Sequence, residues 1–212
     1  QTIIDNMKLD LLVASGGVLS HAPQMQQTAL MLIDSFQPEG ITLLAKDSIF
    51  MMPHLGVLAQ VHSQAAMDVF EKDCLLLLGS VVAPKGIGPK GRPCFKYTIS
   101  SKTLNQKGEL TFGSLELLPL GIGEEAEILI EPYNNFDMGA GSGKPLKKTI
   151  QGGLVGLILD ARGRPLSFSD DIAANMSMVN SWIKELDLYP KIDIPQNGGN
   201  AKTGSIKTSQ KA

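Results

Sequence analysis

The first third of the chain alternates between short apolar runs and stretches of helical spacing. Residues 9–14 form an apolar run that ends at a Ser-Gly-Gly segment at 15–17, which predicts a buried strand entering a tight turn. Apolar residues then recur at helical spacing over 25–36. We expect Ser20 to cap this helix and Pro23 to lie in its first turn.

A second strand and helix follow before the composition changes. Residues 41–45 predict the strand, and residues 53–72 predict a helix with small and apolar contacts. Another apolar run begins at Cys74 and leads into PKGIGPKGRP, which is rich in proline and glycine. We therefore expect a strand and a Pro/Gly-rich linker over residues 73–94, after an N-terminal unit that occupies residues 1–72.

From Phe95 onward the hydrophobic period is two, which is typical of half-buried strands. A turn is expected at 105–108. The run LVGLIL at 154–159 has glycines around it, so we expect a strand that is buried on both faces and approached closely by another backbone. Residues 95–190 are thus predicted to form a small β-sandwich or barrel.

A last helix is expected to close this β-domain. Ser169 can cap it, and two aspartates then favour its first turn. Residues 191–212 contain few apolar side chains to offset the entropy of ordering, so a flexible tail is predicted. The expected apolar stripe of the helix consists of Ile172, Met176, Val179, Ile183 and Leu186.

Composition and charge exclude several classes of protein. The chain has 212 residues and a net charge of −2, which does not provide the dense basic surface that nucleic acid requires. Its apolar runs are far shorter than the roughly 20 residues that cross a bilayer, so we expect no membrane partner. The two cysteines, Cys74 and Cys94, fit neither a disulfide framework nor a zinc site, which indicates a cytoplasmic protein.

The segment LLVASGGVLSHAPQMQQTALMLIDSF at 11–36 carries the candidate chemistry. Its order of strand, paired glycines and helix resembles the adenosine motif of the actin/Hsp70/sugar-kinase ATPase superfamily. A glycine lets a nucleotide approach the backbone closely, and exposed N–H groups favour anionic oxygens. The resemblance implies contact with an adenine nucleotide, and a nearby histidine could reach a phosphate or the ribose. The candidate cofactor-binding residues are Ser15, Gly16, Gly17, Val18 and His21.

Three longer stretches carry a finer resemblance. GGVLSHAPQ at 16–24, QPEGITLLAKDSIFMMPHLGVLA at 37–59 and GGLVGLILDARGRPL at 152–166 resemble the MutL-type accessory proteins of cobalamin-dependent glutamate mutase. These are related to reactivating chaperones that use ATP to release damaged cobalamin from a mutase. The resemblance implies ATP or ADP with Mg²⁺ as cofactor in the complete protein and a mutase subunit as partner, with no direct binding of cobalamin.

The fold class expected from pattern and resemblance together is α/β followed by mainly β. It would comprise part of an actin-like ATPase subdomain, an appended small β-sandwich or barrel and a C-terminal helix. The phosphate loops of the superfamily should precede the adenosine turn, and only eight residues precede the strand here. We therefore expect the C-terminal part of an ATPase that does not hydrolyse ATP alone. The alternative is a non-enzymatic protein-interaction module with a purely structural Gly-Gly turn.

Other polar clusters have plainer explanations. The loop GAGSGKP at 139–145 is similar to a P-loop, but Pro145 stands where a Mg²⁺ ligand should be. Asp160 and the two arginines that follow it are expected to shape a turn. The basic cluster in the linker is expected to be solvated, or else to dock on an acidic partner surface in a salt-sensitive way. That cluster consists of Lys85, Lys90, Arg92 and Lys96.

Overall fold

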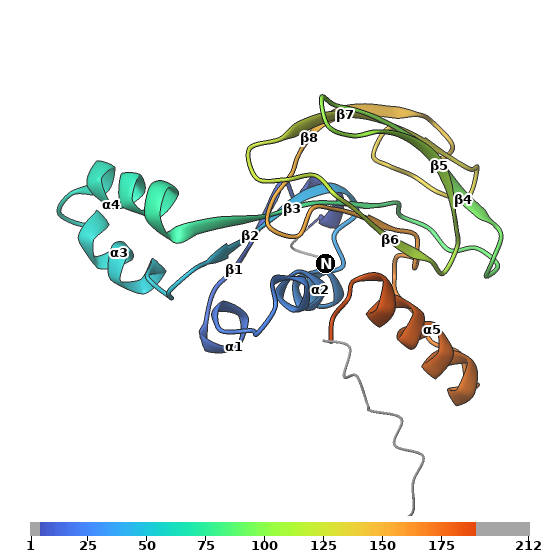
Figure 1. Cartoon of the computed structure of the whole chain (residues 1–212), viewed down its shortest axis with the longest axis horizontal. Coiled ribbons are helices and arrows are strands. Elements are labelled where there is room, and N and C mark those ends of the chain that lie inside the picture. Colours follow the sequence, from blue (N-terminus) through green and yellow to red (C-terminus); the bar gives the residue numbers. More distant parts are fainter. Residues whose placement is uncertain (1–4, 190–212) are drawn as a thin grey trace, which may run out of the picture.

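The computed structural model describes residues 5–189, which form two β-sheets and a set of helices (Figure 1). The strands are β1 (Leu11–Ala14), β2 (Gly40–Asp47), β3 (Leu75–Ala83), β4 (Pro93–Ser100), β5 (Asn105–Thr111), β6 (Leu115–Leu118), β7 (Glu125–Pro132), β8 (Leu146–Gln151) and β9 (Leu157–Asp160). The helices are α1 (Gly17–Ser20), α2 (Met25–Phe36), α3 (Met52–Ala59), α4 (Ser63–Val69) and α5 (Ile172–Glu185), with a 3₁₀ turn at Asn6–Lys8 and a π turn at Phe70–Cys74.

The two sheets differ in topology. The larger is mixed and has the order β1-β2-β3-β9-β6, in which β1 runs parallel to β2, and β3 runs parallel to β9. The smaller is antiparallel and has the order β5-β4-β7-β8. The helical hairpin of α3 and α4 extends away from both sheets (Figure 1).

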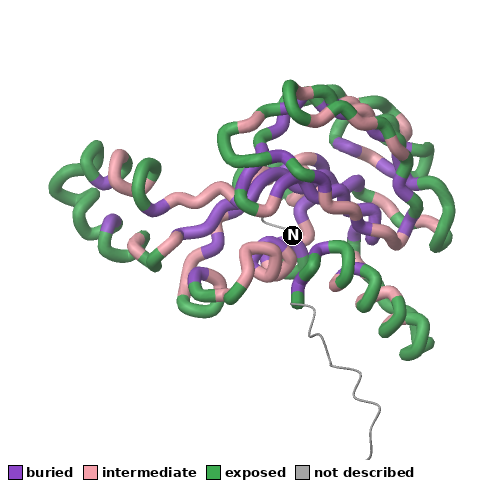
Figure 2. Tube along the Cα trace, in the orientation of Figure 1, coloured by how far each residue is buried: buried purple, intermediate pink, exposed green. Residues whose placement is uncertain are grey.

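The five-stranded sheet lies between two hydrophobic layers. Along β9, Leu157 and Leu159 join the core shared with the four-stranded sheet, whereas Ile158 joins the core formed with α2 and α5. All four residues of β9 are buried, as Figure 2 shows for the central strands. Because side chains alternate along a strand, this sheet supplies a face to each core. The prediction that 154–159 contains a strand buried on both faces is confirmed.

The expected boundary at 73–94 does not separate two folding units. The larger sheet combines β1 to β3 with β6 and β9, which lie within residues 95–190. The expected linker is also anchored by its backbone. Lys85 forms an isolated antiparallel β-bridge with Asp137, and Gly86 forms another with Arg164. The division into residues 1–72 and a self-contained β-domain is therefore wrong, because alternation within a strand does not reveal which partner strand it will have.

Glycines allow strands of distant sequence to cross. A Cβ on Gly79 would lie 1.9 Å from the carbonyl oxygen of Gly156, and a Cβ on Gly153 would lie 2.3 Å from the backbone of Leu78. No side chain fits at such separations. The expected close backbone approach near 154–159 is thus confirmed. The chain has no strand between the end of β8 at Gln151 and the start of β9 at Leu157, and these two strands belong to different sheets.

Three local predictions differ from the structure. Helix α2 begins at Met25 after Gln24, and Ser20 instead ends the short helix α1. The helix expected over 53–72 is broken between α3 and α4. The turn expected at 105–108 lies within β5, because the side chain of Ser101 accepts hydrogen bonds from two following amides and turns the chain earlier.

Helix α5 packs differently from expectation. Its cap is Asp171, which accepts a hydrogen bond from the amide of Ala174. Ile172 and Met176 of the expected stripe are mostly exposed, and the buried anchor is Trp182, whose indole donates to the carbonyl of Gly113 at 2.8 Å. The C-terminal half of α5 therefore packs on the same face of the large sheet as α2.

The tail predicted at 191–212 lies outside the described residues. Within residues 5–189, no helix combines the length and apolar character needed to cross a membrane.

Candidate functional site

The Gly-Gly turn joins β1 to α1, and its two glycines differ in what the backbone requires. Gly16 has a φ of 107°, a conformation that L side chains rarely adopt. Gly17 is the first residue of α1 and is not among the positive-φ residues. A Cβ on Gly17 would meet nothing within 4 Å. The turn itself therefore explains Gly16 but leaves Gly17 without a structural reason.

An open groove of about 540 Å³ lies beside this turn. Three predicted site residues, Gly17, Val18 and His21, line it, whereas Ser15 and Gly16 are not among its lining residues. The other lining residues come from the segment before α2, from α2 itself and from two residues that follow α5. The lining residues are Gly17, Val18, His21, Ala22, Pro23, Gln27, Leu30, Met31, Asp34, Ser35, Leu188 and Tyr189.

Ser15 has a structural contact instead. Its hydroxyl donates to Asp47 at 3.3 Å, and Asp47 also accepts from the amides of Met51 and Met52 at 3.0 and 2.9 Å. Burial alone would raise the pKa of Asp47, but these donors outweigh it and hold the pKa below its ordinary value. The charged carboxylate thus ties the turn to the start of the α3 hairpin.

Two further residues hold α1 in place, and pattern analysis did not identify them. Lys46 is buried, and its ammonium donates to the carbonyl of Ser20 at 2.9 Å. Thr28 of α2 donates to the carbonyl of Leu19 at 3.0 Å. Both bonds satisfy carbonyls at the end of α1, which has no later turn to accept them. A lysine in an apolar strand was the available signal, since buried lysines need a partner.

The polar groups of the groove favour a neutral ligand. None of the lining residues is a lysine or an arginine, so a polyphosphate would find no strong cation there. Gln27 is already engaged, because its amide donates to the carbonyl of Leu188 at 3.0 Å. Asp34 is half-exposed, and one of its oxygens accepts from Arg162 at 2.7 Å. Among residues 5–189, its other oxygen and the Ser35 hydroxyl have no hydrogen-bond partner, so both can bond to hydroxyl or amino groups of a ligand.

Arg162 links the groove to a buried ionic cluster. Asp160 accepts hydrogen bonds from the guanidinium groups of Arg162 and Arg164, at 2.9 and 2.8 Å. Burial opposes ionisation, yet the two arginines hold the pKa of Asp160 well below its usual range. The sequence predicted that these residues shape a turn, but it did not predict that they are buried. In the structure they form an ionic cluster inside the protein.

Comparison with known proteins gives a family match for one segment of the chain. No curated protein and no solved structure matches this chain. Residues 2–74 match the model of the family described as MutL protein, and this segment contains β1, the Gly-Gly turn and every groove-lining residue except Leu188 and Tyr189.

Proposed function

We propose that this chain is part of an ATP-dependent reactivating chaperone for a cobalamin-dependent glutamate mutase, and that its groove binds the adenosine part of the nucleotide. The match of residues 2–74 to the MutL family supports the association with a mutase. The observation that carries the nucleotide assignment is Gly17, a glycine that neither backbone conformation nor packing requires, at the wall of an open groove. A ligand lying against its backbone would explain it.

The chemistry of the groove suits a nucleoside. Val18, Leu30 and Met31 offer apolar surface to a purine, while Asp34 and Ser35 can hydrogen-bond to ribose hydroxyls. The lining lacks a lysine or arginine for the phosphates, and Asp34 is its one acidic residue. We therefore expect the phosphates and Mg²⁺ to be held by other parts of the complete protein, and phosphoryl transfer not to occur in this groove.

A protein-interaction module with a purely structural turn is the second candidate. The α3 and α4 hairpin favours it, because residues 48–67 contain no Asp, Glu, Lys or Arg. Val57 and Val61 are 67% and 75% exposed on this protruding element. Exposed apolar surface of this kind marks contact with other proteins. In this second function, Gly17 could be replaced without effect on any ligand.

Substitution of Gly17→Leu separates the two candidates. Gly16 is unsuitable because its positive φ would destabilise any replacement. At position 17 the new side chain would project into open space, so we expect the melting temperature to change by no more than about 2 °C. Adenosine and ADP affinity, measured by calorimetry and amide NMR, should fall by roughly tenfold or more, which is about 1.4 kcal/mol.

Gly56→Leu is the matched control. Gly56 also lies in a short helix, and a Cβ added there would meet nothing within 4 Å, but it belongs to the distant hairpin. This variant should bind adenosine as the wild type does. If Gly17→Leu retained wild-type affinity, or if adenosine shifted no amide among residues 17–21, the nucleotide assignment would be wrong and the interaction module would remain.

A further inference from the structure

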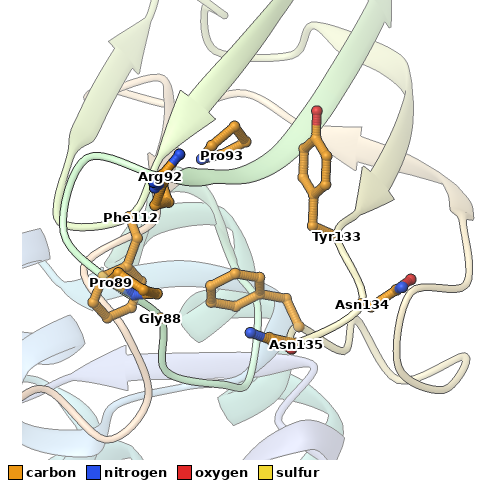
Figure 3. A pocket seen from close by; sticks show the side chains of 9 residues that line it. Gly88, Pro89, Arg92, Pro93, Phe112, Tyr133, Asn134 and Asn135 are labelled. Atoms are coloured by element: carbon orange, nitrogen blue, oxygen red, sulfur yellow. The ribbon is translucent and has the colours of Figure 1, made fainter.

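A second hollow lies far from the Gly-Gly turn in sequence, where the Pro/Gly-rich segment meets the loop after β7. Its volume is about 360 Å³. One side comes from residues 88–93 and the other from residues 133–136, with Phe112 contributed by the turn directly after β5 (Figure 3). The lining residues are Gly88, Pro89, Arg92, Pro93, Phe112, Tyr133, Asn134, Asn135 and Phe136.

The apolar part of this hollow is preformed. The rings of Phe112 and Phe136 pack with centroids 5.8 Å apart and are 7% and 3% exposed. A Cβ on Gly88 would lie 3.0 Å from the Phe136 ring, so a glycine keeps that ring in place. The hydroxyl of Tyr133 donates to Glu109 at 3.0 Å, which holds the third ring. A ligand would therefore meet fixed aromatic and proline surfaces, with little ordering entropy lost on binding.

The rim of the hollow carries an unpaired cation. Arg92 is exposed, and within residues 5–189 its guanidinium has no carboxylate within 4.0 Å and no hydrogen bond to another side chain. Two lysines of the basic cluster are paired instead, Lys85 with Glu39 at 3.2 Å and Lys96 with Glu109 at 4.0 Å, and Lys90 does not line the hollow. No acidic residue lines the hollow. Its charge is thus positive and available to an external anion.

Tyr133 also borders a second hollow of about 270 Å³, which carries one basic and one acidic side chain and whose other lining residues are Lys96, Glu131, Pro132, Gly143 and Pro145. A ligand that crosses the Tyr133 ring would occupy both hollows. An extended peptide has this shape, whereas a small molecule would occupy only one. Exposed aromatic and arginine side chains beside a small pocket are the features that dominate protein-protein contacts.

We propose that this surface binds an acidic peptide segment of a partner protein, with an apolar side chain against Phe112 and Phe136 and an adjacent carboxylate paired with Arg92. Charge complementarity selects this partner: the first hollow lacks acidic residues, and a guanidinium forms strong, often bidentate hydrogen bonds with a carboxylate. One arginine in the lining of the hollow is too little for nucleic acid, which needs several phosphate contacts. The inference does not depend on the nucleotide proposal, because the two sites share no residue.

The test uses two synthetic peptides, acetyl-Glu-Glu-Phe-Glu-Glu-amide and its counterpart with every Glu replaced by Gln. Each is titrated into the full chain by amide NMR at low and high salt. The acidic peptide should shift residues 88–93 and 133–136 and bind about fivefold more tightly than the neutral peptide, with the difference reduced by salt. Residues 17–21 should not respond to either peptide.

Two variants complete the test. Arg92→Gln should remove the preference for the acidic peptide, and because Arg92 is exposed the fold should be retained. Lys102→Gln, an exposed lysine beside a separate hollow, should leave the preference unchanged. The proposal is overturned if Arg92→Gln still prefers the acidic peptide, if Lys102→Gln loses that preference, or if the peptide shifts none of the lining residues.

Discussion

At the scale of single residues, the most constrained ionisable group is the carboxylate of Asp160. It accepts from the amide and Nε of Arg162 at 2.9 and 3.0 Å, and from Arg164 at 2.8 Å. All three side chains are at most 2% exposed. Buried charges are tolerated only with such pairing, because removal from water costs several kcal/mol for each ion. The cluster also reaches the groove, since Arg162 contacts Asp34.

We predict that Asp160→Asn lowers the free energy of unfolding at neutral pH by about 3–5 kcal/mol, since it leaves two buried arginines without their central anion. The pKa of Asp160 is below its ordinary value of 3.8, so its stabilisation is present above that value and is lost as the pH falls below it. The deficit of the variant should therefore shrink in acid. Urea unfolding between about pH 6 and pH 3 measures both effects.

Asp10→Asn is the control for this prediction. The Asp10 side chain is 91% exposed and lies 3.7 Å from Lys148, so its removal should cost less than about 1 kcal/mol. An Asp160→Asn variant as stable as Asp10→Asn would show that the cluster contributes no net stability.

At the scale of elements, the crossing of β3 by the segment before β9 decides how the sheets are connected. Gly79 has a φ of 122°, and a Cβ added to it would lie 1.9 Å from the carbonyl oxygen of Gly156. The apolar run at 154–159 predicted the burial, and the glycines around it predicted the close approach. It did not predict that β9 would pair with β3, because the partner of a buried strand is not encoded in its own alternation.

We predict that Gly79→Ala lowers the free energy of unfolding by more than about 4 kcal/mol, because the new methyl group would collide with backbone that cannot move aside. Gly123→Ala provides the comparison. Gly123 also has a positive φ, 74°, but a Cβ added there would meet nothing within 4 Å, so a loss of about 1–2 kcal/mol is expected. Equal losses in thermal or urea unfolding would mean that backbone conformation, and not the crossing, limits Gly79.

At the scale of the whole molecule, a single sheet connects both halves of the chain. One of its faces packs on the four-stranded sheet, and the other packs on α2 and α5. The hydrophobic pattern located most of the strands but did not indicate that β6 and β9 would join β1 to β3. Long-range pairing of this kind depends on which faces must be covered together, and a local pattern does not contain that information.

We predict that the two cores unfold together. Fluorescence of Trp182 reports the core with α2, and methyl resonances of Ile128 and Ile130 report the core with the four-stranded sheet. Their midpoints in urea should coincide, as expected for one cooperative unit. Separate midpoints would instead restore a domain boundary near residues 73–94.

In the candidate site too, the local sequence pattern predicted some residues, and others were recognised only from tertiary contacts. The run before the paired glycines and the helix after them were sufficient to locate the turn and three residues of the groove wall, Gly17, Val18 and His21. Lys46 and Asp47 were missed, because their roles depend on hydrogen bonds to Ser20, Met51 and Met52 that form only when the strand ends lie side by side.

By itself, the sequence determined where most of the strands and helices of this protein lie, because strand and helix periodicity depends on neighbours a few residues away. Tertiary structure alone decided the partners of β9, the burial of the Asp160 cluster, and the separation of Gly16 from the groove that Gly17 lines. The physical reason is that burial and charge pairing depend on groups that are distant along the chain and become neighbours only after the hydrophobic faces have been covered.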